Sequence, residues 1–199
     1  MIFDKVLGYP DSPRAFYARL WQGDLKRELG QWPQAEQIYG QLARDYAQHG
    51  EAWRAELALA DCHFAQAKAP GDAHQENARQ LYVKLQGQAG VSADVRVEAG
   101  CKLGALLAAT GDKADKARAA ETWHAVAAPF LVPGPRPALG PDGRDWLNRA
   151  LDYLGTQLAD EGRPEEARAV FGQIIQLGLP HAQEARDWLR QHGGTPPEK

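Results

Sequence analysis

The fold is decided by residues 150–177, which read ALDYLGTQLADEGRPEEARAVFGQIIQL. Apolar and small residues recur at every third or fourth position in both halves of this stretch, which is the spacing of one face of an α-helix. They are Ala150, Leu151, Leu154, Gly155 and Leu158 in the first half, and Ala167, Val170, Phe171, Ile174 and Ile175 in the second. The stretch therefore predicts two amphipathic helices.

The break between these helices has the residues of a tight turn. Gly162 can adopt the left-handed conformation that ends a helix, and Pro164 is tolerated in the first turn of the next one. Glu165 and Glu166 follow where a helix N-terminus favours negative charge. We therefore expect a helical hairpin, in which the small residue Gly155 lets the two helices approach closely.

The hairpin recurs three more times along the chain. Its marker, Gly155, is matched by Gly23, Ala60 and Gly104, and an alanine stands five residues before each marker. The second helices share a small, an aromatic and an aliphatic residue at positions i, i+4 and i+7. These triplets are Ala35–Tyr39–Leu42, Ala78–Tyr82–Leu85, Ala119–Trp123–Val126 and Ala167–Phe171–Ile174. Because the markers lie 37, 44 and 51 residues apart, the copies carry insertions of increasing length.

This pattern resembles the tetratricopeptide repeat, a helix–turn–helix unit of about 34 residues with small and aromatic positions of this kind. The best match is L-G-x-x-L at residues 154–158, followed by Gly162, Ala167 and Phe171. The copies depart from the family early in the first helix, where its aromatic residue is replaced by Arg19, Glu56, Gly100 and Leu151. The resemblance implies an all-α fold, a right-handed α-solenoid of four hairpins plus a C-terminal capping helix.

We predict that residues 1–192 form one domain of this kind. The hairpins are expected at about 13–47, 50–88, 92–128 and 144–178, the cap at 181–192 and a disordered tail at 193–199. Five prolines in residues 129–143 disfavour regular helix and favour an extended course. This insertion is interpreted as a connector or, alternatively, as a binding loop that carries Phe130 and Leu131.

The N-terminal residues suggest that the repeat begins earlier. Residues 1–13 resemble the end of a preceding second helix, with Phe3 and Val6 in its aromatic and aliphatic positions. The segment YPDSP at residues 9–13 resembles the turn before a hairpin in bacterial envelope proteins of this family. We therefore expect further repeats or a targeting segment before residue 1. The expected compartment is the periplasm if the chain is a fragment and the cytoplasm otherwise.

Composition and motifs argue against several functions. The net charge of −3, with both signs interspersed, predicts no nucleic-acid surface, and no apolar run approaches the length of a membrane span. The six histidines include no i, i+4 pair on one helix, and phosphate-binding and nucleophile motifs are missing. Cys62 and Cys101 are expected to be small buried residues, and Ser12 and Ser92 to cap helices. The sequence predicts no enzyme, cofactor or metal site.

The family resemblance implies that the first helix of each hairpin lines a concave groove that binds a protein or peptide. In the first two hairpins the predicted groove residues are Tyr17, Leu20, Asp24, Arg27, Arg54, Leu57, Asp61 and Phe64. The later hairpins contribute Glu98, Cys101, Ala105, Arg149, Asp152 and Thr156. Tryptophans near hairpin ends are candidate interface anchors, namely Trp32, Trp53 and Trp146.

The recurring leucine and aspartate positions indicate a groove with an apolar strip beside an acidic one, which suits a partner segment with basic and apolar residues. Alternatively, Asp24 and Asp61 are solvated, while Leu20 and Leu57 contact neighbouring helices. The sequence thus predicts a non-catalytic interaction scaffold, and the resemblance implies a bacterial envelope complex. The alternatives are a cytoplasmic adaptor and a regulatory or substrate-recruiting appendage of a larger enzyme.

Overall fold

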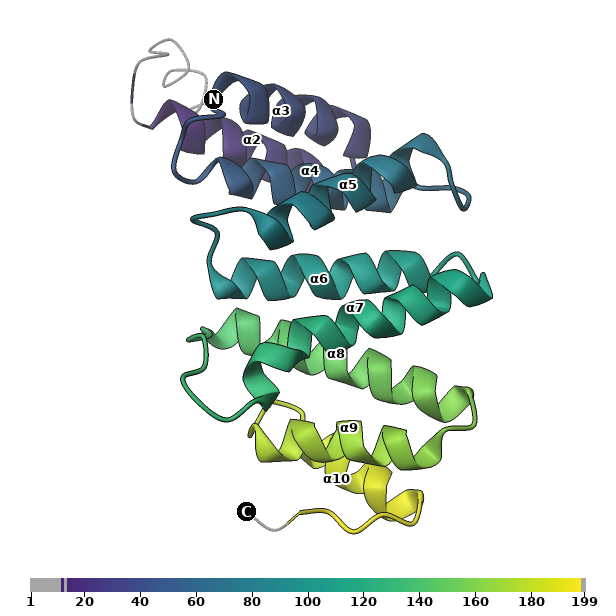
Figure 1. The fold of residues 1–199 in the computed structure, drawn as a ribbon. Coiled ribbons are helices and arrows are strands. Elements are labelled where there is room, and N and C mark those ends of the chain that lie inside the picture. Colours follow the sequence, from purple (N-terminus) through teal and green to yellow (C-terminus); the bar gives the residue numbers. More distant parts are fainter. Residues whose placement is uncertain (1–11, 13, 198–199) are drawn as a thin grey trace. The chain divides into compact units, whose positions relative to one another are not determined.

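The computed structural model describes residues 12 and 14–197, and this part of the chain is helical with short connections (Figure 1). A first compact unit ends at Gly90 and a second begins at Val91. Unit 1 contains helices α2 (Ala15–Glu28), α3 (Trp32–Asp45), α4 (Ala52–Gln66) and α5 (Ala73–Gly87). Unit 2 contains α6 (Ala93–Ala108), α7 (Lys113–Leu131), α8 (Pro141–Asp160), α9 (Pro164–Gln176) and α10 (Ala182–Gln191).

The predicted all-α fold is confirmed. Consecutive helices pair as α2–α3, α4–α5, α6–α7 and α8–α9, and α10 follows the last pair. The helical segment expected in residues 1–13 lies, apart from Ser12, outside the described residues. The described residues therefore contain four hairpins and a C-terminal helix, and their repeat positions can be compared with the sequence pattern.

In three of the hairpins the marker residue of the first helix faces the aromatic residue of the second helix at close range. Gly104 faces Trp123 so closely that a Cβ at the glycine would overlap the indole ring. Gly155 faces Phe171 in the same way, with a Cβ 2.8 Å from Cε2 of the phenyl ring. Gly23 faces Tyr39, and in the second hairpin Ala60 and Tyr82 are both fully buried. The register predicted from the sequence is therefore confirmed.

The turns inside the hairpins follow from glycines and from one aspartate. Gly30, Gly111 and Gly162 have φ angles of 69°, 75° and 75°, the left-handed conformation that other residues rarely adopt. The longer turn before α5 is closed by Asp72, whose Oδ1 accepts a hydrogen bond from the Gln75 backbone N–H at 2.7 Å. These residues end one helix and start the next within a few positions.

The proline-rich segment is shorter than predicted. Helix α7 continues through Pro129 to Leu131, and α8 begins at Pro141, so the non-helical connection spans 132–140. Pro129 lies in the last turn of α7, where it removes a single backbone hydrogen bond, and Pro141 occupies the first helical position, where no N–H partner is needed. The alternative interpretation as a binding loop that carries Phe130 and Leu131 is also wrong, because both residues lie in α7 and the Phe130 side chain is buried in the core of unit 2.

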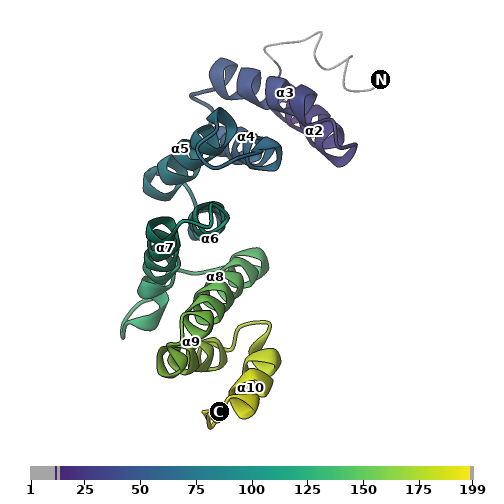
Figure 2. The same ribbon diagram turned by 90° about the vertical axis from the view of Figure 1, so that its right-hand side faces the viewer.

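The cap on the last hairpin is built as the sequence predicted. The Trp188 ring stacks on Phe171 of α9, with 4.2 Å between ring centroids, and Ala185 and Leu189 are buried beside it. Gly194 donates its backbone N–H to the Leu189 carbonyl at 2.7 Å and thereby closes the end of α10. Figure 2 shows α10 lying beside α9 at the end of unit 2.

Each unit has its own apolar core. In unit 1 the core is formed mainly by α2, α3 and α4 and includes Phe16, Leu20 and Tyr39. In unit 2 the core runs from α6 to α10, with Trp123 and Phe171 among its members. None of the helices in the described part of the chain is long and apolar enough to cross a membrane.

The marker contact can be tested with two glycine substitutions in unit 2. Gly104→Ala should lower the unfolding free energy by about 1–3 kcal/mol, because the new Cβ overlaps Trp123. Gly172→Ala in α9 is the matched control, since no atom lies within 4 Å of its new Cβ. The control should gain about 0.5–1 kcal/mol from higher helix propensity. Equal effects of the two changes in urea unfolding would contradict the marker contact.

Candidate functional site

Seven of the eight predicted groove residues of unit 1 lie on one side of α2 and one side of α4. Their helical spacing of three or four positions places those of each helix on a common face. We call this region the α2–α4 surface, and it consists of Tyr17, Trp21, Asp24 and Arg27 on α2 and Arg54, Leu57, Asp61 and Phe64 on α4. It contains seven of the eight predicted residues and adds Trp21.

Arg27 joins the two helices at the middle of this surface. Its Nη2 lies 3.5 Å from Oδ1 of Asp24, one turn earlier on α2, and its Nη1 lies 3.6 Å from Oδ2 of Asp61 on α4. The side chain of Asp61 is 18% exposed and that of Asp24 is 33% exposed. The acidic strip predicted from the sequence is therefore a chain of two carboxylates bridged by one guanidinium, with a net charge of −1.

Each of these two carboxylates also accepts a hydrogen bond from a buried tyrosine in the second helix of its own hairpin. The Tyr39 hydroxyl donates to Oδ1 of Asp24 at 2.7 Å, and the Tyr82 hydroxyl donates to Oδ1 of Asp61 at 2.8 Å. Burial and the hydrogen bond to Asp24 raise the pKa of Tyr39 well above its ordinary value, so the phenol remains a donor. The two aspartates thus have a structural role in closing their hairpins, and contact with a partner stays a prediction.

Two predicted groove residues are buried instead. Leu20 is 3% exposed and packs with Phe16 and Tyr39 in the core of unit 1, and Cys101 is fully buried in the core of unit 2. Both were assigned to a groove from the family resemblance and helical spacing, which do not reveal how far a neighbouring helix covers a given face. Leu20 and Cys101 are therefore removed from the set of candidate partner contacts.

An exposed tryptophan that the sequence reasoning missed extends the surface. Trp21 has 53% of its area exposed, and its ring centroid lies 6.4 Å from that of Tyr17, one turn earlier on α2. Arg54 is exposed on α4 and pairs with Glu51 at 3.0 Å. The signal for Trp21 was present as an aromatic pair at i and i+4, but the sequence placed this tryptophan in no role.

The later hairpins carry a different set of groups. Glu98 pairs with Lys102 at 2.6 Å. The cationic groups of Lys102 and Arg149 lie over the Trp146 ring, 4.9 Å and 4.6 Å from its centroid. Asp152 and Thr156 are exposed on α8, and Ala105 packs partly against the core. Trp146 is therefore flanked by two cations of its own unit, while Trp32 and Trp53 are half-buried in unit 1.

Unit 2 also contains an open groove between α7 and the α8–α9 hairpin, with a volume of about 890 Å³. Its floor is apolar and includes Leu154, Leu158 and Val170, whereas its rim is charged. The rim residue Arg163 pairs with Glu166 at 2.6 Å and with Glu161 at 3.3 Å. No local sequence pattern predicts this groove, because its lining residues come from three helices of two successive hairpins.

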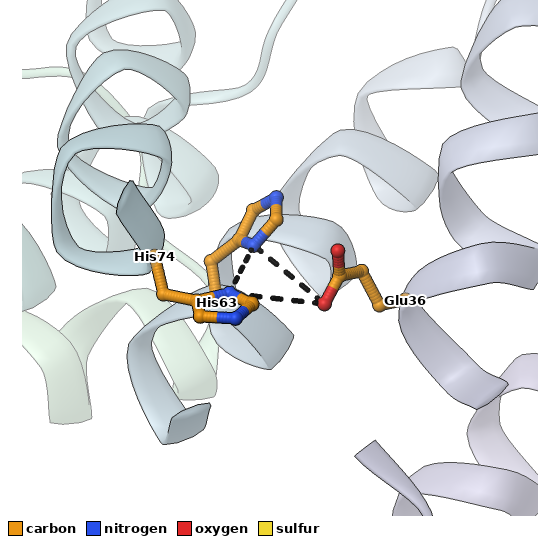
Figure 3. A group of neighbouring side chains, drawn as sticks. All are labelled: Glu36, His63 and His74. Carbon is orange, nitrogen blue, oxygen red and sulfur yellow. Dashed lines mark hydrogen bonds and ion pairs between the residues drawn. The ribbon is translucent and has the colours of Figure 1, made fainter. Parts of the chain in front are cut away.

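One cluster of metal-ligating types occurs in the part of the chain that the structure describes. Three side chains turn toward one another, those of Glu36 in α3, His63 in α4 and His74, the second residue of α5 (Figure 3). The two Nδ1 atoms lie 3.1 Å apart, and each lies 3.8 Å from Oε2 of Glu36. Burial lowers the pKa of His63, with Glu36 opposing this shift, so the imidazole is predominantly neutral near pH 7.

Comparison with known protein families identifies the first hairpin. Residues 17–49 match the model of the tetratricopeptide repeat, a range that covers α3 and all but the first two residues of α2. No curated protein sequence matches the chain. The match includes Tyr17, Asp24 and Arg27 of the α2–α4 surface, and tetratricopeptide repeats typically bind proteins or peptides.

The tyrosine–aspartate bond can be measured with a double-mutant cycle. Tyr39→Phe should lower the unfolding free energy by about 0.5–1.5 kcal/mol, because it removes the hydroxyl donor to Asp24. In an Asp24→Ala background the same change should cost much less, since the acceptor is already absent. Additive effects of the two substitutions in chemical denaturation would show that the hydroxyl and the carboxylate do not interact.

The buried thiol of unit 2 predicts a loss of stability in alkali. Burial raises the pKa of Cys101 to about 12, whereas an unfolded thiol has a pKa of about 8.5. The stability that the buried, protonated thiol contributes is fully present below the pKa of the unfolded state. It is lost as the pH rises toward the pKa of the folded state, by up to about 1.4 kcal/mol per pH unit. Cys101→Ala should therefore show a shallower decline of unfolding free energy between about pH 8.5 and 10. Parallel curves for the variant and the wild type would refute this linkage.

Proposed function

Because the chain is a helical repeat protein of the tetratricopeptide-like type, we propose that it is a non-catalytic interaction scaffold that binds a partner segment along the α2–α4 surface. The observation that carries this proposal is the exposed Trp21, next to the half-buried Tyr17 and beside the Asp24–Arg27–Asp61 chain. Tryptophan, tyrosine and arginine are the residue types that are enriched in binding hot spots. The family match at residues 17–49 includes both Tyr17 and Trp21 of α2.

The charges favour a particular kind of partner. Two carboxylates and one guanidinium leave one net negative charge on the strip, and the tyrosine hydroxyls hold the carboxylates in place. Charges that are already ordered lose little conformational entropy when a partner binds. We therefore propose an extended or helical segment that places an apolar side chain on Trp21 and a basic side chain near Asp24 and Asp61.

The non-catalytic part of the proposal rests on the state of the potential nucleophiles. Both cysteines are buried, and burial raises the pKa of Cys62 and of Cys101 to about 12. A thiol with such a pKa is a poor nucleophile at neutral pH. Ser92 accepts a hydrogen bond from the Val95 backbone N–H at 3.4 Å and so caps α6. These groups have structural roles that account for their presence.

The proposed surface can be tested with a random peptide library displayed on phage. Wild-type protein should select peptides that combine basic and apolar residues. Trp21→Ala should weaken their binding about 10-fold or more, because truncation removes the aromatic anchor. Tyr153→Ala in unit 2 is the matched control, since Tyr153 is 41% exposed and also aromatic.

The charge requirement is tested with Asp24→Asn and Asp61→Asn. The amide oxygen can still accept the tyrosine hydrogen bond, so the substitutions remove charge with little change of geometry. Binding of the selected peptides should weaken, and its dependence on salt should decrease. The proposal fails if Trp21→Ala binds the peptides as well as wild type does, or if Tyr153→Ala alone abolishes binding.

A further inference from the structure

We propose that Glu36, His63 and His74 form a binding site for one zinc ion, a property that is separate from the partner binding proposed above. The three residues come from three helices of unit 1, and Figure 3 shows their side chains converging on one point. Glu36 belongs to the first hairpin, and the two histidines belong to the second. A bound ion would therefore link the two hairpins of unit 1.

The distances between the ligand atoms fit one coordination shell. Two ligands that bind zinc at about 2.1 Å in tetrahedral geometry are about 3.4 Å apart. The observed separations of 3.1 Å, 3.8 Å and 3.8 Å bracket this value. The carboxylate oxygen lies 3.8 Å from either imidazole nitrogen, which is too far for a normal hydrogen bond to the histidines. One cation bound to all three atoms fits these separations.

The chemistry of the donors favours zinc among the common ions. Two imidazole nitrogens and one carboxylate oxygen are the ligand set of zinc sites that keep a fourth position open. Calcium and magnesium prefer oxygen ligands throughout. The His63 side chain is 9% exposed and that of His74 is 38% exposed, so the site is buried on one side and open to solvent on the other. Water can complete the coordination from the open side.

A neighbouring glutamine holds the carboxylate in position. Gln66 lies one turn after His63 on α4, and its Nε2 donates to Oε2 of Glu36 at 2.6 Å and to the Cys62 carbonyl at 3.1 Å. A carboxylate oxygen has two lone pairs, so Oε2 can accept this bond and still bind a metal ion. Outer hydrogen bonds of this kind orient metal ligands, and Gln66 is therefore a positioning residue.

The test uses the untagged full chain, stripped of metal with a chelator and then titrated with zinc chloride. Calorimetry should show one zinc ion bound per chain, and the melting temperature should rise with zinc concentration. His74→Ala and Glu36→Gln should weaken binding by at least about 10-fold. Glu36→Gln keeps the shape of the side chain, so it remains informative if His74→Ala perturbs the fold.

His124→Ala provides the matched control, because His124 is an exposed histidine on α7 outside this cluster. It should bind zinc as the wild type does. Gln66→Ala should weaken zinc binding by about 10–100-fold and change the visible spectrum of the cobalt-substituted protein, which reports ligand geometry. The proposal is overturned if wild-type protein binds no zinc. It is equally overturned if His74→Ala and Glu36→Gln bind zinc with wild-type affinity.

Discussion

The structure depends on the contact between a small residue in the first helix of each hairpin and an aromatic ring in the second. In three hairpins the small residue is glycine, and the ring occupies the space that a side chain at that position would fill. In these three hairpins the missing side chain lets the two helices approach closely. The remaining core residues, such as Leu42 and Ile174 one turn further along, are then buried by the same approach.

The identity of the aromatic residue also determines which polar group stands beside it. Tyr39 and Tyr82 bring hydroxyls that need acceptors, and Asp24 and Asp61 supply them directly after the marker residues. Trp123 instead donates its indole N–H to a backbone carbonyl, that of Cys101, at 3.0 Å. Hairpins closed by tyrosine therefore carry an acidic residue at this position. The acidic strip of the α2–α4 surface follows from core packing and is confined to unit 1.

The two units consequently present different chemistry for the same hairpin architecture. Unit 1 combines an exposed tryptophan, a bridged pair of carboxylates and a cluster of two histidines with a glutamate. Unit 2 has an apolar groove with a charged rim. Because the proposed peptide surface and the proposed zinc site share α4, zinc bound between α3, α4 and α5 would hold that helix in place relative to α3.

Sequence patterns predicted the features that depend on neighbours within one helix or one hairpin. The spacing of Gly155 and Phe171 indicated the packing register, and Trp188 indicated the cap, because helical periodicity places these residues on definite faces. Burial was harder to predict. Leu20 was assigned to a groove and Phe130 to a loop, yet both side chains are in cores. A second neighbouring helix covers Leu20, and α7 continues past Pro129 and includes Phe130.

By itself, then, the sequence determined the helical hairpins, their register and their order, because these are encoded by residues a few positions apart. Only the tertiary structure decided that Glu36, His63 and His74 meet, since they lie in separate helices and share no local pattern. The same holds for the bridge from Arg27 to Asp61. Contacts between hairpins depend on how one helix packs against the next, and helical periodicity carries no information about that packing.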